Sequence, residues 1–362
     1  MLKKYPFYIK FTVILFGLVL FAYSITAIKA VLIPLSFGLM LAMLLNPLVD
    51  LLLKWKLRKV LAIAIVLLLA IAVLAGIGYL LSTQISNFSD QLPVLKKKFF
   101  ELLDKLQAGI AERFNLNLQK QNELINEAST NMTPNVSEAL GSVAGSLEML
   151  FLLPLYTFLF LYYKNLILNF LYEVFAEEDS KEVAVILNHT KGAIQKYMLG
   201  LLLEALIVAT LDSVALMILG VQYAILLGVL GALLNIIPFI GGIIAILLPL
   251  AIATITKDGY GTQIGIIIAY LIIQFIDNHF LMPFIVSSKV KINALVSIII
   301  VLLGGAAWGI PGMFLSIPFL GILKIIFDRI PELKPWGKLL GYEIPIRHKG
   351  RILAIIKKRN SK

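Results

Sequence analysis

The chain of 362 residues contains no cysteine and only three histidines, His189, His279 and His348, which lie far apart. Without cysteine there is no disulfide, no thiolate metal ligand and no cysteine nucleophile. The sequence also has no His-Glu-x-x-His zinc pattern and no Gly-x-x-x-x-Gly-Lys-Ser/Thr phosphate loop. We therefore expect no metal centre, no resident cofactor, no ATP-driven motor and no enzyme.

Charged residues are scarce, at 15%, whereas hydrophobic residues make up 60% and the mean hydropathy is +0.93. The hydrophobic residues gather in long runs, and about 20 apolar residues are needed for a helix to cross a bilayer. The sequence therefore predicts an all-α polytopic membrane protein with about eight membrane segments, two of them broken or re-entrant.

The net charge of +11 lies mostly beside the apolar runs. Residues 331–362 hold nine Lys and Arg against two acidic residues, and Lys54, Lys56, Arg58 and Lys59 follow the second run. Basic clusters next to membrane helices mark the cytoplasmic side and contact anionic lipid headgroups. We therefore predict cytoplasmic N- and C-termini and a lipid-binding tail, and no nucleic-acid partner.

The order of polar and apolar stretches predicts six regions. Residues 1–83 would form three spans, 84–145 an extracytoplasmic helical insert, 146–163 a fourth span, 164–197 a cytoplasmic interfacial linker, 198–330 a transport core, and 331–362 the basic tail. In the insert, apolar residues recur at three- and four-residue steps from Leu92 to Ile110. This periodicity predicts an amphipathic helix that packs on another helix or a neighbouring subunit.

Two apolar segments, 223–256 and 293–327, are too long for one span, at 34 and 35 residues. The first is broken at Asn235-Ile-Ile-Pro238-Phe-Ile-Gly241-Gly242, and the second at Gly304-Gly305-Ala-Ala-Trp308-Gly309-Ile-Pro311-Gly312. Each segment either crosses once or turns back at its break as a re-entrant hairpin. The lengths favour hairpins, and so do Lys289 and Lys291, which would otherwise lie outside.

Irregular backbone survives in hydrocarbon only inside protein or beside a water-filled cavity. The breaks are therefore candidate gating positions, at Pro238, Gly241, Gly242, Gly309, Pro311 and Gly312. The alternative is a kink that packs against its neighbours and binds no ligand.

Between the two breaks lies a polar cluster in an apolar run. Gln274, Asp277 and Asn278 are spaced i, i+3 and i+4, so they share one helix face, and Asn235 adds an amide at the first break. A carboxylate and several amides suit a hydrated cation or a hydroxylated solute. The alternative is a hydrogen-bonded clamp between membrane helices.

Two further acids, Glu204 and Asp212, fall in one apolar run. An acidic residue at mid-membrane costs about 2.5–3.5 kcal/mol on insertion scales and usually serves a function. Eight helical residues separate the two side chains by roughly 80°, which allows both to border one cavity.

At these residues the chain resembles the autoinducer-2 exporter family of bacterial membrane proteins. The matching motifs are Tyr197-Met-Leu-Gly200, Asn235-Ile-Ile-Pro238-Phe-Ile-Gly241-Gly242, Gln274-x-x-Asp277-Asn278-x-x-Leu281-x-Pro283, and Trp308-Gly309-Ile-Pro311-Gly312 followed by Ile317-Pro318. The resemblance implies a homo-oligomeric inner-membrane permease, with a pentamer as one form. Family members are associated with export of autoinducer-2, and some with Na⁺(Li⁺)/H⁺ antiport. The resemblance extends the candidate sites to Pro238, Gly241, Asp277, Asn278, Pro283, Gly309 and Gly312.

We therefore predict a secondary transporter that exports a small polar solute, with autoinducer-2 as the named candidate, by alternating access at the broken helices. Na⁺ or H⁺ would be the coupling ion. The first alternative is a Na⁺(Li⁺)/H⁺ antiporter of monovalent cations. The second is a membrane scaffold without transport, in which the insert and the basic tail bind partners.

Overall fold

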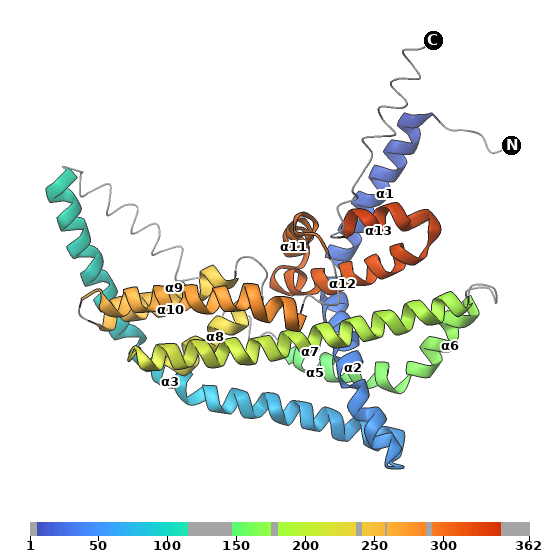
Figure 1. The fold of residues 1–362 in the computed structure, drawn as a ribbon, viewed down its shortest axis with the longest axis horizontal. Helices are drawn as coiled ribbons and strands as arrows, with labels where there is room; N and C mark the ends of the chain where they lie inside the picture. Colours follow the sequence, from blue (N-terminus) through green and yellow to red (C-terminus); the bar gives the residue numbers. More distant parts are fainter. Residues whose placement is uncertain are drawn as a thin grey trace, which may run out of the picture.

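The computed structural model describes residues 6–114, 147–174, 180–236, 241–257, 259–286 and 292–341. Every named element in these ranges is a helix, which confirms the all-α prediction (Figure 1). The elements are α1 (Phe7–Ala27), α2 (Lys29–Lys54), α3 (Lys59–Phe114), α5 (Leu147–Tyr162), α6 (Lys164–Val174), α7 (Ser180–Ile218), α8 (Ala224–Asn235), α9 (Gly241–Thr256), α10 (Gly261–Ile276), the π-helix η1 (Asp277–Val286), α11 (Ala294–Trp308), α12 (Ile310–Arg329), the short 3₁₀ helix η2 (Pro331–Leu333) and α13 (Lys334–Leu340).

Several of these helices are long and apolar enough to cross a membrane. Within the described residues there are six, and the pair α5–α6, bent by 61°, makes a seventh if it forms one span. Many of their large apolar side chains are exposed, as expected when lipid rather than water covers them. The protein is therefore a multi-pass membrane protein, and the expected total of about eight segments stays a prediction.

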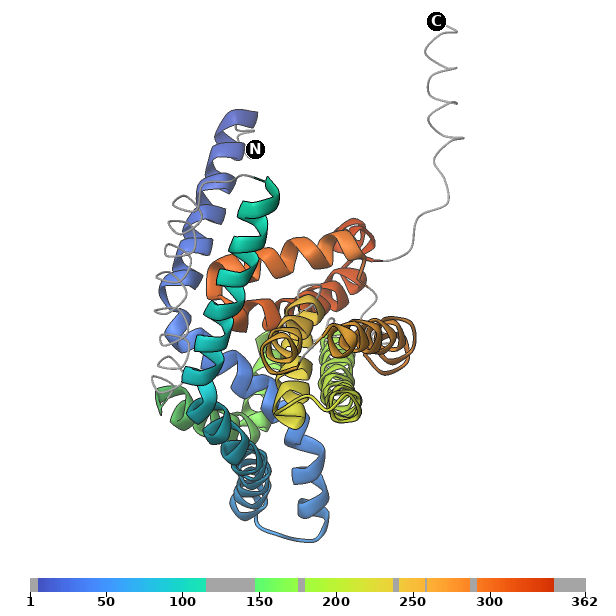
Figure 2. The same ribbon diagram turned by 90° about the vertical axis from the view of Figure 1, so that its left-hand side faces the viewer.

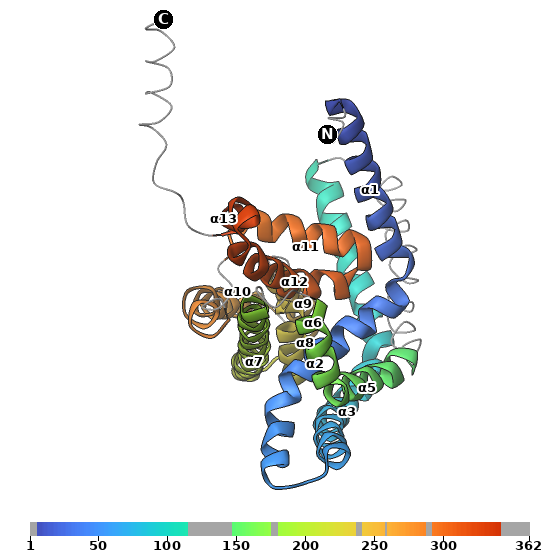
Figure 3. The same ribbon diagram turned by 90° about the vertical axis from the view of Figure 1, so that its right-hand side faces the viewer.

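Helix α7 is the element around which the others pack. Figure 1 shows it running along most of the molecule, and Figures 2 and 3 show it end-on beside α10. Leu216, near its end, belongs to a buried cluster with α8, α9 and α10. Ile194 joins a second cluster with α2 and α12, and Tyr197 and Leu201 join a third with η1 and α12. One helix thus links the two broken segments.

The first broken segment folds back on itself. Gly231 on α8 faces Ala245 on α9, and Gly241 lies against Leu234 and Asn235. Contacts in this order describe an antiparallel pair of helices. The hairpin interpretation is therefore supported, and Pro238 itself lies outside the described residues.

The second broken segment also forms an antiparallel hairpin, made of α11 and α12. Gly304 packs against Gly312, and the Ser316 hydroxyl donates to the carbonyl oxygen of Ile300 at 3.0 Å, so the turn is centred on Trp308. Gly309 follows with φ of 65°, a left-handed conformation that favours glycine. The indole N–H of Trp308 donates to the Ile25 carbonyl oxygen at 3.1 Å, which ties the turn to α1.

The start of the second hairpin is also fixed. Asn293 caps α11 by accepting a hydrogen bond from the Val296 N–H at 2.9 Å. Its amide nitrogen donates to the Leu339 carbonyl oxygen at 2.6 Å, so the same side chain holds α13. The segment before it, which includes Lys289 and Lys291, lies outside the described residues.

Two regional expectations differ from the structure in where helices begin and end. The third span and the start of the insert form one helix, α3, of 56 residues, and residues 115–146 lie outside the described part. In Figure 1 the second half of α3 turns away from the other helices. Within the predicted linker, α6 covers Lys164–Val174, and Ser180 already begins α7, which continues into the predicted transport core.

Candidate functional site

The candidate site lies between α7, the α8–α9 hairpin and the junction of α10 with η1. Two cavities occur there: an outer one of about 510 Å³ and an inner one of about 10 Å³, the room of a single water molecule. The residues that line both cavities are Asn235, Tyr270, Gln274 and Asp277. These shared residues make the two cavities parts of one site.

Asp277 lies at the centre of this site. It is only 3% exposed and begins η1, where the helix widens from α to π spacing. The Asn235 amide donates to Asp277 Oδ2 at 2.9 Å and the Gln274 amide at 3.5 Å, while Oδ1 has no hydrogen-bond partner among the described residues. Such π-helical turns occur frequently at functional sites. Here the π-helix begins at Asp277, and the hydrogen bond from Asn235 connects it to the first broken segment.

Helix α7 brings two more carboxyl groups to the site. Glu204, 4% exposed, lines the outer cavity and adjoins Asp277, and Asp212, 2% exposed, lines the inner cavity. Val208 lies between them and also lines the inner cavity, so this face of α7 points into the site. Glu204 Oε2 and Asp212 Oδ1 have no hydrogen-bond partner in the described part of the chain. Buried acids of this kind need a proton, a cation or a donor from a ligand.

The sequence prediction missed two residues of the site. Tyr270 is 6% exposed, lines both cavities, and its hydroxyl has no hydrogen-bond partner among the described residues. Gly231 lines the inner cavity beside it. Each lies one helical turn before a predicted site residue, Tyr270 before Gln274 and Gly231 before Asn235, but its residue type alone gave no signal.

The structure brings all six predicted binding residues to the two cavities. Asn235, Gln274 and Asp277 line both, Glu204 and Asn278 line the outer one, and Asp212 lines the inner one. Asn278 is otherwise exposed, because η1 does not keep the α-helical spacing on which its predicted position relied.

The predicted gating residues divide between the site and other places. Gly241 and Gly242 open α9, and Gly242 lines the outer cavity. Pro283 lies exposed within η1, and Gly309, Pro311 and Gly312 belong to the second hairpin, away from both cavities. Gly312 lies inside α12, where it packs against α11 and does not interrupt the helix.

Gly242 gives space to Gln274. A Cβ on Gly242 would lie 2.4 Å from Gln274 Oε1, so alanine there must displace this flexible side chain. We expect Gly242→Ala to keep the fold and to raise the half-saturation concentration for transport about five- to tenfold, because one polar contact to the ligand is lost. Flux measured against solute concentration, with Gly261→Ala as the control in open space, tests this. Equal half-saturation in both variants would contradict it.

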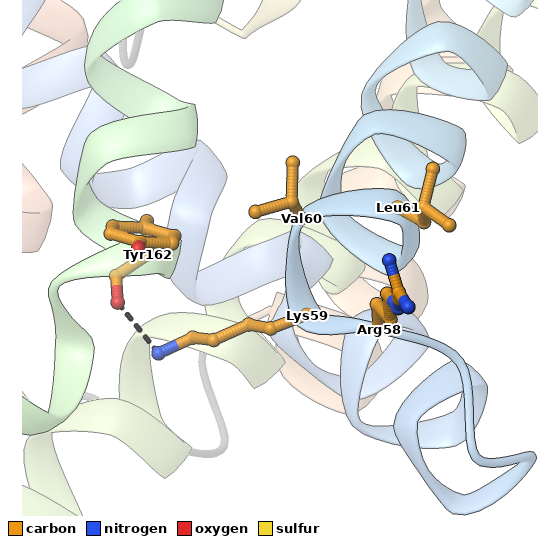
Figure 4. Close-up of a pocket in the computed structure, with 5 residues that line it drawn as sticks. All are labelled: Arg58, Lys59, Val60, Leu61 and Tyr162. Atoms are coloured by element: carbon orange, nitrogen blue, oxygen red, sulfur yellow. Dashed lines mark hydrogen bonds between the residues drawn. The ribbon is translucent and has the colours of Figure 1, made fainter.

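A separate hollow lies at the turn between α2 and α3 (Figure 4). Arg58, Lys59, Val60, Leu61 and Tyr162 line about 630 Å³ of open space. The Lys59 ammonium group donates to the Tyr162 carbonyl oxygen at 2.6 Å, and this bond joins α3 to α5. The hollow is wide and shares no residue with the acidic cavities, so we assign it no role in solute binding.

A family profile and several known proteins match the chain over most of its length. The sequence profile described as "AI-2E family transporter" matches residues 12–332. The chain is 26% identical over 320 residues to a "Putative transport protein" of Haemophilus influenzae, and the alignment covers 86% of this chain and 90% of that protein. It is 22% identical over 326 residues to the "AI-2 transport protein TqsA" of Escherichia coli, which covers 89% and 92% of the two chains.

Proposed function

The chain belongs to the AI-2E family of transporters, and from this premise we propose that it is a secondary permease that exports a small polar solute. Autoinducer-2 is the first candidate, because a relative that aligns over most of both chains is named as an AI-2 transport protein. The observation that supports solute binding most directly is the buried Asp277 carboxyl group, which accepts from Asn235, adjoins Glu204 and lines a cavity of about 510 Å³. A cavity of this size lies within the range of small-molecule sites.

Alternating access would use the α8–α9 hairpin as its moving part. Asn235 at the end of α8 bonds Asp277, and Gly242 at the start of α9 adjoins Gln274, so both sides of the break touch the site. A solute that bound Asp277 and Asn235 would therefore act on the hairpin turn directly. Broken helices that contribute to a substrate site in this way are a recurring feature of secondary transporters.

A Na⁺(Li⁺)/H⁺ antiporter is the alternative. Three buried acids, Glu204, Asp212 and Asp277, gather within one site, and none of them has a Lys or Arg partner among the described residues. Carboxyl groups inside a membrane protein often relay protons or hold cations. We further propose that both termini are cytoplasmic, that the permease is a homo-oligomer and that the basic tail binds lipid.

The test is flux through the purified full-length chain in proteoliposomes. We expect saturable movement of a small polar solute that depends on an imposed Na⁺ or proton gradient, with protein-free liposomes as the control. Movement of Na⁺ or Li⁺ against protons, with no organic solute moved, would favour the antiporter. No flux of any solute or cation under either gradient would contradict transport and favour the scaffold alternative.

A further inference from the structure

The two cavities of the site are acidic without any basic side chain to balance them. Glu204, Asp212 and Asp277 line them, and none of the described lining residues is Lys, Arg or His. The neighbouring His279 is exposed, and its ring nitrogen lies 3.0 Å from the Phe275 carbonyl oxygen, within its own helix. Any ligand there therefore meets three carboxyl groups and, among the described lining residues, no basic group.

The site also has more free acceptors than free donors. The carboxyl groups of Glu204 and Asp277 lie against each other, and Asp212 Oδ1 has no partner among the described residues. The amides of Asn235 and Gln274 already donate to Asp277 Oδ2. Leaving a buried acceptor without a donor is costly, so the complementary ligand is one that donates several hydrogen bonds.

In the inner cavity, two polar groups surround one small space. Asp212 Oδ2 and the Tyr270 hydroxyl lie 3.2 and 3.5 Å from the position that a Cβ on Gly231 would take. Asp212 is 2% exposed, and the absence of a side chain on Gly231 leaves about 10 Å³ of open space beside it. A primary ammonium group has about the size of a water molecule and three N–H donors. It fits this space and these acceptors.

We propose that the inner cavity is an ammonium subsite and that the permease prefers a small primary amine, whose polar body fills the outer cavity, over a solute without nitrogen such as autoinducer-2. This inference rests on the proposed transport function. Negatively charged solutes of the same size are excluded, since they would meet three acidic groups at close range. The shared chemistry is that of a monovalent cation, so Na⁺ is the competing occupant.

Three linear six-carbon probes separate the effects of charge and shape. Glucamine, sorbitol and gluconate differ mainly at one end, which is an ammonium group, a hydroxyl group or a carboxylate. We expect purified full-length protein in detergent to bind glucamine at least about tenfold more tightly than sorbitol and to show no binding of gluconate in calorimetric titration. Replacing NaCl by KCl at constant ionic strength should leave glucamine affinity unchanged.

Two variants assign the preference to the inner cavity. Gly231→Ala places a methyl group where the ammonium would lie, and Asp212→Asn removes the charge at nearly constant shape. Each should reduce the glucamine-to-sorbitol ratio to about one, whereas Gly192→Ala, in open space on the same helix as Asp212, should retain it.

The outcomes separate this inference from the transport function. Equal affinity for glucamine and sorbitol, binding of gluconate, no binding of any probe, or displacement of glucamine by Na⁺ would overturn the ammonium subsite. Gradient-driven flux of other solutes could still support transport in that case. Tight glucamine binding without flux in proteoliposomes would support the subsite and contradict transport.

Discussion

Replacing Asp277 by asparagine should reduce solute flux by about a hundredfold or more, because the site loses its central charge. The carboxyl group is 3% exposed, accepts from Asn235, and adjoins Glu204. Asparagine keeps the shape and still offers an oxygen to Asn235, so the hairpin contact survives while the negative charge is lost. Flux into proteoliposomes, at equal amounts of inserted protein, measures this effect.

The control for this prediction is the same chemical change at an exposed position. Asp90→Asn alters an exposed acid on α3 and should leave flux unchanged. Thermal unfolding of both variants in detergent should match that of the unmodified chain. Normal flux through Asp277→Asn would remove this residue from the binding site, whatever the transported solute is.

The sequence prediction of the site began from its acids, because charge in an apolar run has few explanations. Glu204, Asp212 and Asp277 stand out at a glance, and helical periodicity places the first two on neighbouring faces of one helix. The structure confirms that all three line adjoining cavities. Their roles in binding remain predictions, because packing alone does not reveal which ligand they hold.

Tyr270 and Gly231 were missed for a physical reason. Tyrosine and glycine are common in membrane helices, so neither signals a site until a fold brings it against an acid. What marks them here is contact across helices: the Tyr270 hydroxyl and Asp212 Oδ2 both face the missing side chain of Gly231. Contacts between residues so distant in the sequence cannot be found from periodicity within one helix.

Some features of the fold were likewise predictable from the sequence and others were not. Gly and Pro in the overlong apolar segments predicted where the chain could turn back. The second turn is centred on Trp308, and α8 and α9 pack antiparallel on either side of the first break. The end of the third span was predicted near residue 83, close to the apolar part Lys59–Ser86, but the end of its helix was not, because polar residues after Leu81 can continue a helix beyond a membrane as readily as they can end it. Helix α3 continues to Phe114.

The second large effect concerns Gly312, which permits the closest approach in the second hairpin. A Cβ on this residue would lie 2.0 Å from the Gly304 carbonyl oxygen and 2.8 Å from the Trp308 Cβ. Both are atoms of helical backbone or its first side-chain carbon, so neither can rotate away. Gly312→Ala must therefore separate α11 from α12, and this weakens the bond from Ser316 to the Ile300 carbonyl oxygen.

We expect Gly312→Ala to destabilise the protein by about 1–3 kcal/mol or more, the usual cost of overpacking. This cost exceeds the gain of about 0.5–1 kcal/mol that alanine otherwise has over glycine in a helix. Thermal unfolding in detergent should show a midpoint lower by about 1–4 °C. Loss of the hairpin contact should also lower flux, because α12 packs on α7, which carries Glu204 and Asp212.

Gly305→Ala is the matched control, since it lies on the same hairpin and gains the same helical preference. Its Cβ would meet only the flexible end of Met313, at 2.6 Å from the terminal methyl group, which can move aside. Gly76→Ala, in open space on α3, reports the helical preference alone. If Gly312→Ala unfolds at the same temperature as Gly305→Ala, the close contact with Gly304 does not hold the hairpin together, and the packing of α12 on α7 must do so.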